Sequence, residues 1–232
     1  MRNIIGIGAA LLLSAAAGSA FAAPFTLTST SFKNGGTIPQ TNAGNIMGCT
    51  GDGKSPALEW KNPPAGTKSF ALLVHDPDAP TGGAGFWHWI VYNIPADATS
   101  LPENATIPTM PKGTVEGNTD MGKPGYVGPC PPPGSPKHHY NFMLYPLKVD
   151  KLDVPTGATA SYVGFSAGMN VIGKPAKLTG LYARPKEPKA AAAPAAAPAP
   201  AAAPAPAHPA AAAHPAPPAP PPPPAPPAPP KK

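Results

Sequence analysis

Three ionisable side chains stand at the ends of apolar segments of the sequence. Asp76 follows the apolar run of residues 69–74, and His88 and His138 lie at the starts of two later apolar segments. Imidazole rings can donate hydrogen bonds to a phosphate or a carboxylate, and they gain charge near neutral pH when an anion lies close. A carboxylate can orient an imidazole or accept hydrogen bonds from an ammonium group. Together these residues predict a place where a ligand binds.

Short apolar segments bounded by turn residues predict the strands that would position this site. They comprise residues 69–74, 87–94 and 141–147. Neighbouring side chains of a strand point to opposite faces of the sheet. We therefore expect His88 to share a face with Ile90 and Tyr92. Trp87 and Trp89 should point to the opposite face.

A proline-rich loop, residues 128–134, precedes the third of these strands. Its prolines fix φ and remove backbone donors, so the loop should be rigid. Alternation along the following strand places the imidazole of His138 and the hydroxyl of Tyr140 on one face. His139 should point to the other face. Two separate loops therefore each deliver a histidine to the start of a strand.

Further short strands are expected over residues 25–32, 57–60 and 177–182. The spacing of apolar residues predicts one helix over residues 161–172. Residues 96–112 and 118–127 are rich in turn formers and should be irregular. This pattern favours an antiparallel β-sandwich with few short helices.

Four motifs occur in one order along the chain: Asp76-Pro-Asp-Ala-Pro80, Trp87-His-Trp89, Gly128-Pro-Cys-Pro-Pro132 and His138-x-Tyr140. Together they resemble the phosphatidylethanolamine-binding protein family, in its bacterial Raf kinase inhibitor-like branch. The resemblance spans roughly residues 25–184. It implies two antiparallel sheets around one core, with a pocket at one end that binds phosphoethanolamine-like groups, phosphate or acetate.

The resemblance assigns seven residues of this chain to that pocket: Asp76, His88, Gly128, Pro131, Pro132, His138 and Tyr140. A phosphate is expected against the two histidines and the tyrosine, with Asp76 ordering the site, and no cofactor is expected. Family members commonly carry an arginine where His139 stands, but alternation places this residue outside the pocket. The spacing of residues 133–137 leaves open whether Pro132 or Pro133 contacts the ligand.

These features favour a binding or regulatory module over an enzyme. One alternative is a protease inhibitor that acts through its surface. Another is a metal-dependent enzyme in which Asp76, His88 and His138 form a 2-His-1-carboxylate site, although tight ligand spacing is absent. Residues 164–168 match the G-x-S-x-G nucleophile motif, but the only downstream histidines lie in the tail, so we interpret the match as chance.

The first 22 residues have the pattern of a secretory signal peptide. Arg2 provides the positive charge, residues 4–17 are apolar, and Ala20-Phe-Ala22 predicts cleavage after Ala22. The chain is therefore expected to be exported, to the periplasm or the medium. An oxidising compartment favours pairing of Cys49 with Cys130, the only two cysteines; two buried free thiols are the alternative.

The predicted domains are the signal peptide, a folded domain of residues 23–187 and a disordered Ala/Pro-rich tail of residues 188–232. The tail is expected to be a spacer, or else a tether that contacts a partner or the cell-envelope surface. When Arg2 and the three lysines of the tail are left out, the chain has 13 basic and 11 acidic side chains. This small excess of positive charge does not predict nucleic acid or an anionic membrane as a binding partner. The family resemblance is compatible with a homodimer.

Overall fold

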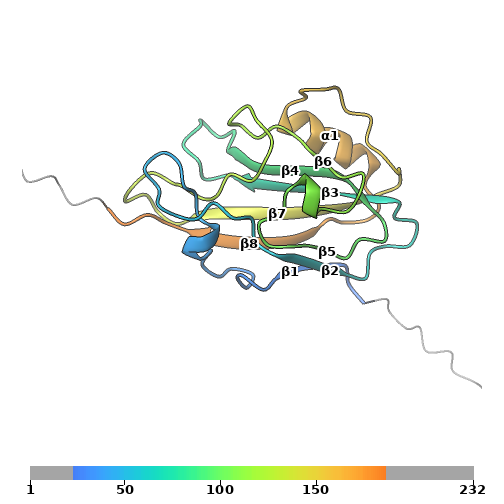
Figure 1. Ribbon diagram of the computed structural model, residues 1–232, viewed down its shortest axis with the longest axis horizontal. Helices are drawn as coiled ribbons and strands as arrows, with labels where there is room; N and C mark the ends of the chain where they lie inside the picture. The colour runs from blue at the N-terminus through green and yellow to red at the C-terminus, as the bar shows by residue number, and fades with distance from the viewer. Residues whose placement is uncertain (1–22, 187–232) are drawn as a thin grey trace, which may run out of the picture. The chain divides into compact units, whose positions relative to one another are not determined.

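Two antiparallel β-sheets form the scaffold of residues 23–186, the part of the chain that the computed structural model describes (Figure 1). The larger sheet has the strand order β6-β4-β3-β7-β8, and the smaller has the order β1-β2-β5. The strands are β1 (Thr26–Ser29), β2 (Leu58–Lys61), β3 (Ser69–Asp76), β4 (Phe86–Pro95), β5 (Ser100–Leu101), β6 (Val115–Glu116), β7 (His138–Leu147) and β8 (Ala176–Tyr182). The predicted sandwich is therefore confirmed. The expected signal peptide, its cleavage position after Ala22 and the Ala/Pro tail lie outside the described residues.

Strand β3 lies at the centre of the larger sheet and is covered on both faces. Phe70, Leu72 and Val74 belong to the core between the two sheets. Ala71 and Leu73 belong to a second core on the other face, beneath the helix α1 (Ala160–Asn170). Burial on both faces explains why this segment is a continuous apolar run rather than an alternating one.

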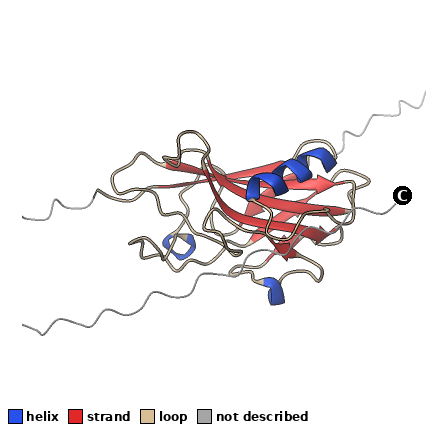
Figure 2. Ribbon diagram, turned by 90° about the horizontal axis from the view of Figure 1, so that it is seen from above, coloured by secondary structure: helices blue, strands red, loops and turns tan. Residues whose placement is uncertain are grey.

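Helix α1 covers the outer face of the larger sheet (Figure 2). It begins at Thr159, whose side chain accepts a hydrogen bond from the backbone N–H of Tyr162. The predicted helix is confirmed within two residues, but its small residues face the sheet and its large apolar residues face outward. Phe165 is 66% exposed. The G-x-S-x-G match lies within this helix and not on the strand-to-helix turn that a nucleophile requires.

A β-bulge in β4 changes which face each side chain occupies. Val74 of β3 pairs with Trp89, whereas the next residue, His75, pairs with Trp87, so His88 is the extra residue between them. The simple alternation predicted above is therefore wrong at this point. Trp87 packs in the helix-side core with Ile90 and Tyr92, and Trp89 packs in the core between the sheets.

Several short elements were not predicted, because two or three residues carry no periodic signal. Strand β5 lies within the stretch expected to be irregular, and β6 pairs with β4 at the edge of the larger sheet. Two short 3-10 helices, η1 (Gln40–Asn42) and η2 (Ile107–Thr109), lie in loops. Over the described residues, no helix has the length and apolar character to cross a membrane.

Candidate functional site

A cavity of about 210 Å³ lies at one end of the core between the sheets, and all seven residues expected at the pocket line it. Its lining comprises Met47, Asp76, Ala79, Pro80, Thr81, Phe86, His88, Gly128, Cys130, Pro131, Pro132, His138 and Tyr140. Pro132 lies on the cavity, and Pro133 is absent from its lining. The structure thus brings the predicted residues together, and their role in binding a ligand stays a prediction.

The polar floor of the cavity comes from three adjacent strands, β4, β3 and β7. Asp76 ends β3, and its Oδ2 accepts a hydrogen bond from Nδ1 of His138 at 2.7 Å. The second carboxylate oxygen, Oδ1, accepts from the backbone N–H of Asp78 at 2.9 Å. Both side chains are almost fully buried. Asp76 therefore fixes the orientation of the His138 ring, whose Nε2 has no hydrogen bond to the described residues.

His88 is fixed in a different way, by the backbone of the loop before β7. Its Nδ1 lies 2.7 Å from the carbonyl oxygen of Val127, and the N–H of Val127 donates to the carbonyl oxygen of His88 at 2.9 Å. Because a carbonyl oxygen only accepts, Nδ1 carries a proton. Burial lowers the pKa of His88 to about 4. The ring is therefore neutral near neutral pH, and its Nε2 is a hydrogen-bond acceptor.

The hydroxyl of Tyr140 is a buried polar group with no hydrogen-bond partner among the described residues. The side chain is 1% exposed, and its ring centroid lies 5.0 Å from that of His88 and 6.4 Å from that of His138. Burial, followed by the negative charge of Asp76, raises the pKa of this hydroxyl, so it keeps its proton. The Asp76 carboxylate is close enough to contribute to this shift, although the hydroxyl makes no hydrogen bond of good geometry to it. A buried donor without such a bond is unfavourable by about 1–3 kcal/mol.

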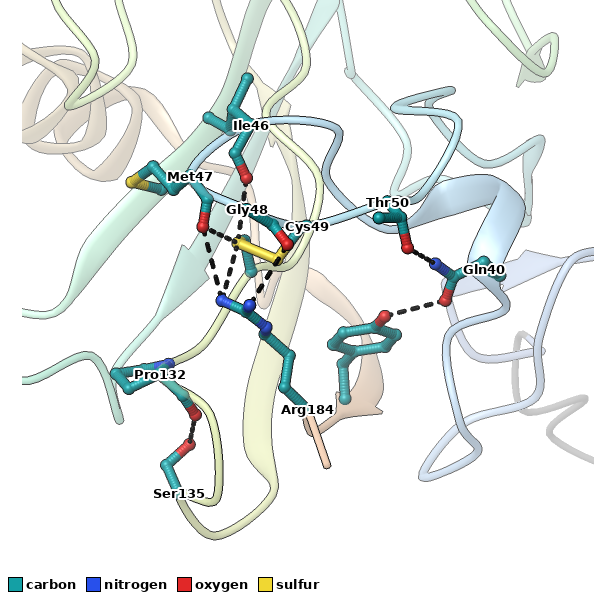
Figure 3. The surroundings of a disulfide bond; sticks show 11 residues. Gln40, Ile46, Met47, Gly48, Cys49, Thr50, Pro132, Ser135 and Arg184 are labelled. Atoms are coloured by element: carbon teal, nitrogen blue, oxygen red, sulfur yellow. Dashed lines mark hydrogen bonds between the residues drawn. A yellow bond between two sulfur atoms is a disulfide. The ribbon is translucent and has the colours of Figure 1, made fainter. Parts of the chain in front are cut away.

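The rim of the cavity comes from loops, and a disulfide joins two of them (Figure 3). Cys49 and Cys130 form the predicted bond across 81 residues of sequence. The bond holds Met47 beside the loop that contains Cys130, and both of these residues line the cavity. In Figure 3 the guanidinium of Arg184 points toward this joint, and it donates to the carbonyl oxygen of Gly48 at 3.2 Å.

Six lining residues were not predicted as part of the site: Met47, Ala79, Pro80, Thr81, Phe86 and Cys130. Ala79 and Pro80 belong to the Asp76 motif and Thr81 follows it directly, so the loop after β3 could have been predicted as part of the site. Met47 is distant in sequence, and only the disulfide indicates its position. The loop between β3 and β4 is stabilised by Thr81, whose hydroxyl donates to the carbonyl oxygen of Gly85 at 3.0 Å.

Two neighbouring histidines lie outside the cavity lining. His139 is exposed and points away from His138, as alternation predicts, and its ring and backbone N–H both bond Asp78 at 2.7 Å. His75 packs on Trp87, with ring centroids 4.2 Å apart. These contacts account for the positions of both side chains, so neither histidine requires a ligand.

The cavity lining contains no lysine or arginine. Nor do residues 23–186 contain a group of three or more His, Cys, Asp or Glu side chains arranged to hold a metal ion. Hydrogen bonds to the carbonyl oxygen of Val127 and to Oδ2 of Asp76 engage the Nδ1 atoms of His88 and His138. What the arrangement offers is hydrogen bonding from Tyr140 and two oriented imidazoles.

The sequence was also compared with known families and structures. Residues 28–183 match the family model described as phosphatidylethanolamine-binding protein. The chain belongs to the phosphatidylethanolamine-binding protein family. The sequence resemblance is thereby confirmed over most of the described residues, and with it a binding-type function.

Relatives in this family include bacterial proteins. YbcL from Escherichia coli K12 is 42% identical over 167 residues, which cover 71% of this chain and 90% of that protein. The crystal structure of E. coli YbcL, described as a new member of the mammalian PEBP family, has a TM-score of 0.66 and covers 69% of this chain and 99% of that one. A putative lipoprotein, LppC from Mycobacterium tuberculosis, is 41% identical over 138 residues, covering 60% of this chain and 62% of that protein.

Proposed function

We propose that this family member is a binding module, rather than an enzyme, for small anions or phosphorylated head groups of the phosphoethanolamine kind. The observation that carries the proposal is the buried, unpartnered Tyr140 hydroxyl beside two oriented histidines in one cavity. An oxyanion accepts hydrogen bonds from such donors. The membership in a family named for phosphatidylethanolamine binding agrees with this chemistry.

The size and lining of the cavity favour a head group over a lipid tail. About 210 Å³ is far more than the roughly 10–15 Å³ that one water molecule requires, so a phosphoryl group with a short substituent fits. The floor is polar, and the rim residues Met47, Pro80 and Pro131 provide apolar contact for the substituent. Long acyl chains would have to lie outside.

We also propose that the protein acts after export. The N-terminal 22 residues have the signal-peptide pattern, and a disulfide between Cys49 and Cys130 is typical of oxidising compartments. A relative named as a putative lipoprotein agrees with this location. The ligand would then be met in the cell envelope or the medium.

Calorimetric titration with phosphoethanolamine and inorganic phosphate tests the binding function. Saturable binding is expected for the wild type, and loss of it for His88→Ala and for His138→Ala. Tyr140→Phe is the control for folding, because it removes only an unpartnered hydroxyl, and it should weaken binding without loss of the fold. Absence of binding by the wild type, or unchanged affinity in all three variants, would refute the proposal.

A further inference from the structure

We propose that a groove beside the disulfide is a second site, which takes anionic low-molecular-weight thiols and exchanges them onto Cys49. The groove has a volume of about 460 Å³, within the range of roughly 300–1,000 Å³ that is usual for small-molecule sites. It is separate from the cavity at the end of the core, and the proposal does not depend on what that cavity binds. It follows from the positions of the two sulfur atoms and from the charges beside them.

The disulfide lies between the groove and the cavity. Cys49 lines the groove, whereas Cys130 lines the cavity. Both cysteines are half-buried, unlike the side chains of the two cores. Thiol–disulfide exchange requires that a thiolate reach one sulfur of the bond, and cysteines buried in a core do not react. The groove therefore gives a small thiol access to the Sγ of Cys49 in the folded protein.

The lining of the groove carries positive charge. It includes the guanidinium of Arg184 and the exposed ammonium of Lys186, and the described residues of the lining include no aspartate or glutamate. The rest of the wall is polar. The hydroxyl of Tyr182 donates to Oε1 of Gln40 at 3.0 Å, and the amide of Gln40 donates to the hydroxyl of Thr50 at 3.3 Å (Figure 3). Two cations in a polar groove favour a thiol that carries carboxylates.

Arg184 also stabilises the leaving group of the exchange. Its Nη1 lies 3.8 Å from the Sγ of Cys130. The guanidinium is held there by two carbonyl oxygens, since Nη1 donates to Met47 at 3.5 Å and Nη2 donates to Gly48 at 3.2 Å. A neighbouring cation lowers the pKa of a cysteine thiol, and a thiol of lower pKa leaves faster. Cys130 is therefore expected to leave as the thiolate when Cys49 is attacked.

The exchange is a two-step reaction in which the thiol is the reductant. In the first step its thiolate attacks the Sγ of Cys49, the bond between the two protein sulfurs breaks, and the electron pair of that bond goes to Cys130. The products are a mixed disulfide at Cys49 and a thiolate at Cys130. In the second step another molecule of the thiol attacks the mixed disulfide and forms the disulfide of the ligand. Two thiols are thus oxidised as the protein disulfide is reduced.

Reduction kinetics with thiols of different charge test the site. Near neutral pH glutathione is negative, 2-mercaptoethanol is neutral and cysteamine is positive. Each rate is divided by the rate of the same thiol with hydroxyethyl disulfide, a neutral reference that removes differences in intrinsic reactivity. At roughly 20 mM salt the corrected rate should be about five-fold higher for glutathione than for cysteamine, and the difference should vanish at about 500 mM NaCl. Equal corrected rates at low salt would overturn the proposal. Rates independent of thiol concentration would also overturn it, because the disulfide would then react only on unfolding.

Peptide mass spectrometry identifies the sulfur that is attacked. The reaction with glutathione is stopped early with acid, and free thiols are alkylated at low pH. Glutathione is expected on Cys49 and the alkyl group on Cys130. Glutathione found mainly on Cys130 would contradict the assignment, because the thiol would then have entered from the cavity.

Two lysine variants separate the charge of the groove from the net charge of the protein. Lys186→Gln should lower the corrected rate for glutathione roughly two- to three-fold and leave that for 2-mercaptoethanol unchanged. Lys177→Gln, near the other end of β8, makes the same change in net charge and is the matched control. Equal effects of the two variants would show that the groove does not select the thiol.

Arg184→Gln tests the leaving group. The variant should react more slowly with all three thiols, because the cation beside the Sγ of Cys130 is gone. Arg184→Lys, which keeps the charge, should recover part of the rate. Unchanged or faster reduction of Arg184→Gln would contradict the role of Arg184, and the result for Lys186→Gln tests the groove independently of it.

Discussion

The hydroxyl of Tyr140 is buried without a hydrogen bond to the described residues, which should reduce the stability of the fold. Replacing it by phenylalanine removes a buried donor without removing any observed hydrogen bond, so Tyr140→Phe should raise the free energy of unfolding by about 1 kcal/mol. Urea denaturation of the ligand-free protein measures this. A lower stability of the variant would mean that the hydroxyl has an acceptor that compensates its burial.

His88 makes the stability of the domain depend on pH. Its folded-state pKa is about 4 against 6.5 for the exposed side chain, so between these values the unfolded chain binds more protons than the folded one. Stability is therefore complete above pH 6.5 and falls as the pH drops toward 4, by on the order of 3 kcal/mol.

The matching variant is His88→Asn, whose amide can replace Nδ1 as donor to Val127 and does not titrate. Denaturation curves at several pH values should show a smaller loss of stability below pH 6.5 in this variant than in the wild type. Parallel curves for the two proteins would show that His88 is not the group responsible.

At the scale of elements, the sequence predicted the strands that carry the site. It did not predict the bulge in β4 that sets the orientation of His88. Alternation correctly placed His138 and Tyr140 on one face, because β7 pairs without interruption with β3 and β8. It failed at His88, because one extra residue in β4 shifts the register against β3. A bulge is set by the pairing of two strands, and the residues of one strand do not reveal it.

The disulfide should contribute both to stability and to the shape of the cavity. In the chain-entropy model, a link across 81 residues stabilises the fold by about 4 kcal/mol. The double variant Cys49→Ser with Cys130→Ser should lose about this much in urea denaturation and should bind phosphoethanolamine more weakly, because Met47 is no longer held at the rim. If the serine variant bound as tightly as the wild type, the rim would not depend on the link.

Gly128 has a packing role that is separate from contact with a ligand. An added Cβ would lie 2.5 Å from the backbone nitrogen of Gly44, where the 44 and 128–130 segments run side by side. Gly128→Ala should therefore lower stability by roughly 1–3 kcal/mol. Gly168→Ala is the control, since nothing lies within 4 Å of its Cβ position. Thermal unfolding of both variants checks this, and equal midpoints would contradict the close approach.

For the molecule as a whole, apolar runs and turn residues predicted the sandwich, because they determine the strands. The family resemblance assigned the seven residues, which line one cavity and whose role in binding stays a prediction. The short strands at the edges of the two sheets were less predictable. Two-residue strands such as β5 and β6 form only because a longer strand is already in place. The outward face of α1 was also unexpected, since large apolar residues normally face the core. Here the close approach to the sheet leaves room only for small ones, as at Ala167.

The distribution of charge predicts how binding responds to salt. No lysine or arginine lines the cavity, and Asp76 and His138 are shielded from solvent. Affinity for phosphoethanolamine should therefore change less than about two-fold between 50 and 500 mM NaCl, because screening acts mainly on exposed charges. Calorimetry at several salt concentrations measures this. A steep fall in affinity with salt would place the binding charge on the surface instead.

The cavity is built in two parts, a floor at the ends of three adjacent strands and a rim of loops. In the proposed function, the floor would contact the anion and the rim would contact the substituent attached to it. Loops accept substitutions and insertions more readily than paired strands do. Substitutions at Met47, Pro80 and Thr81 should therefore change which substituent is accepted, and should leave recognition of the anion unchanged.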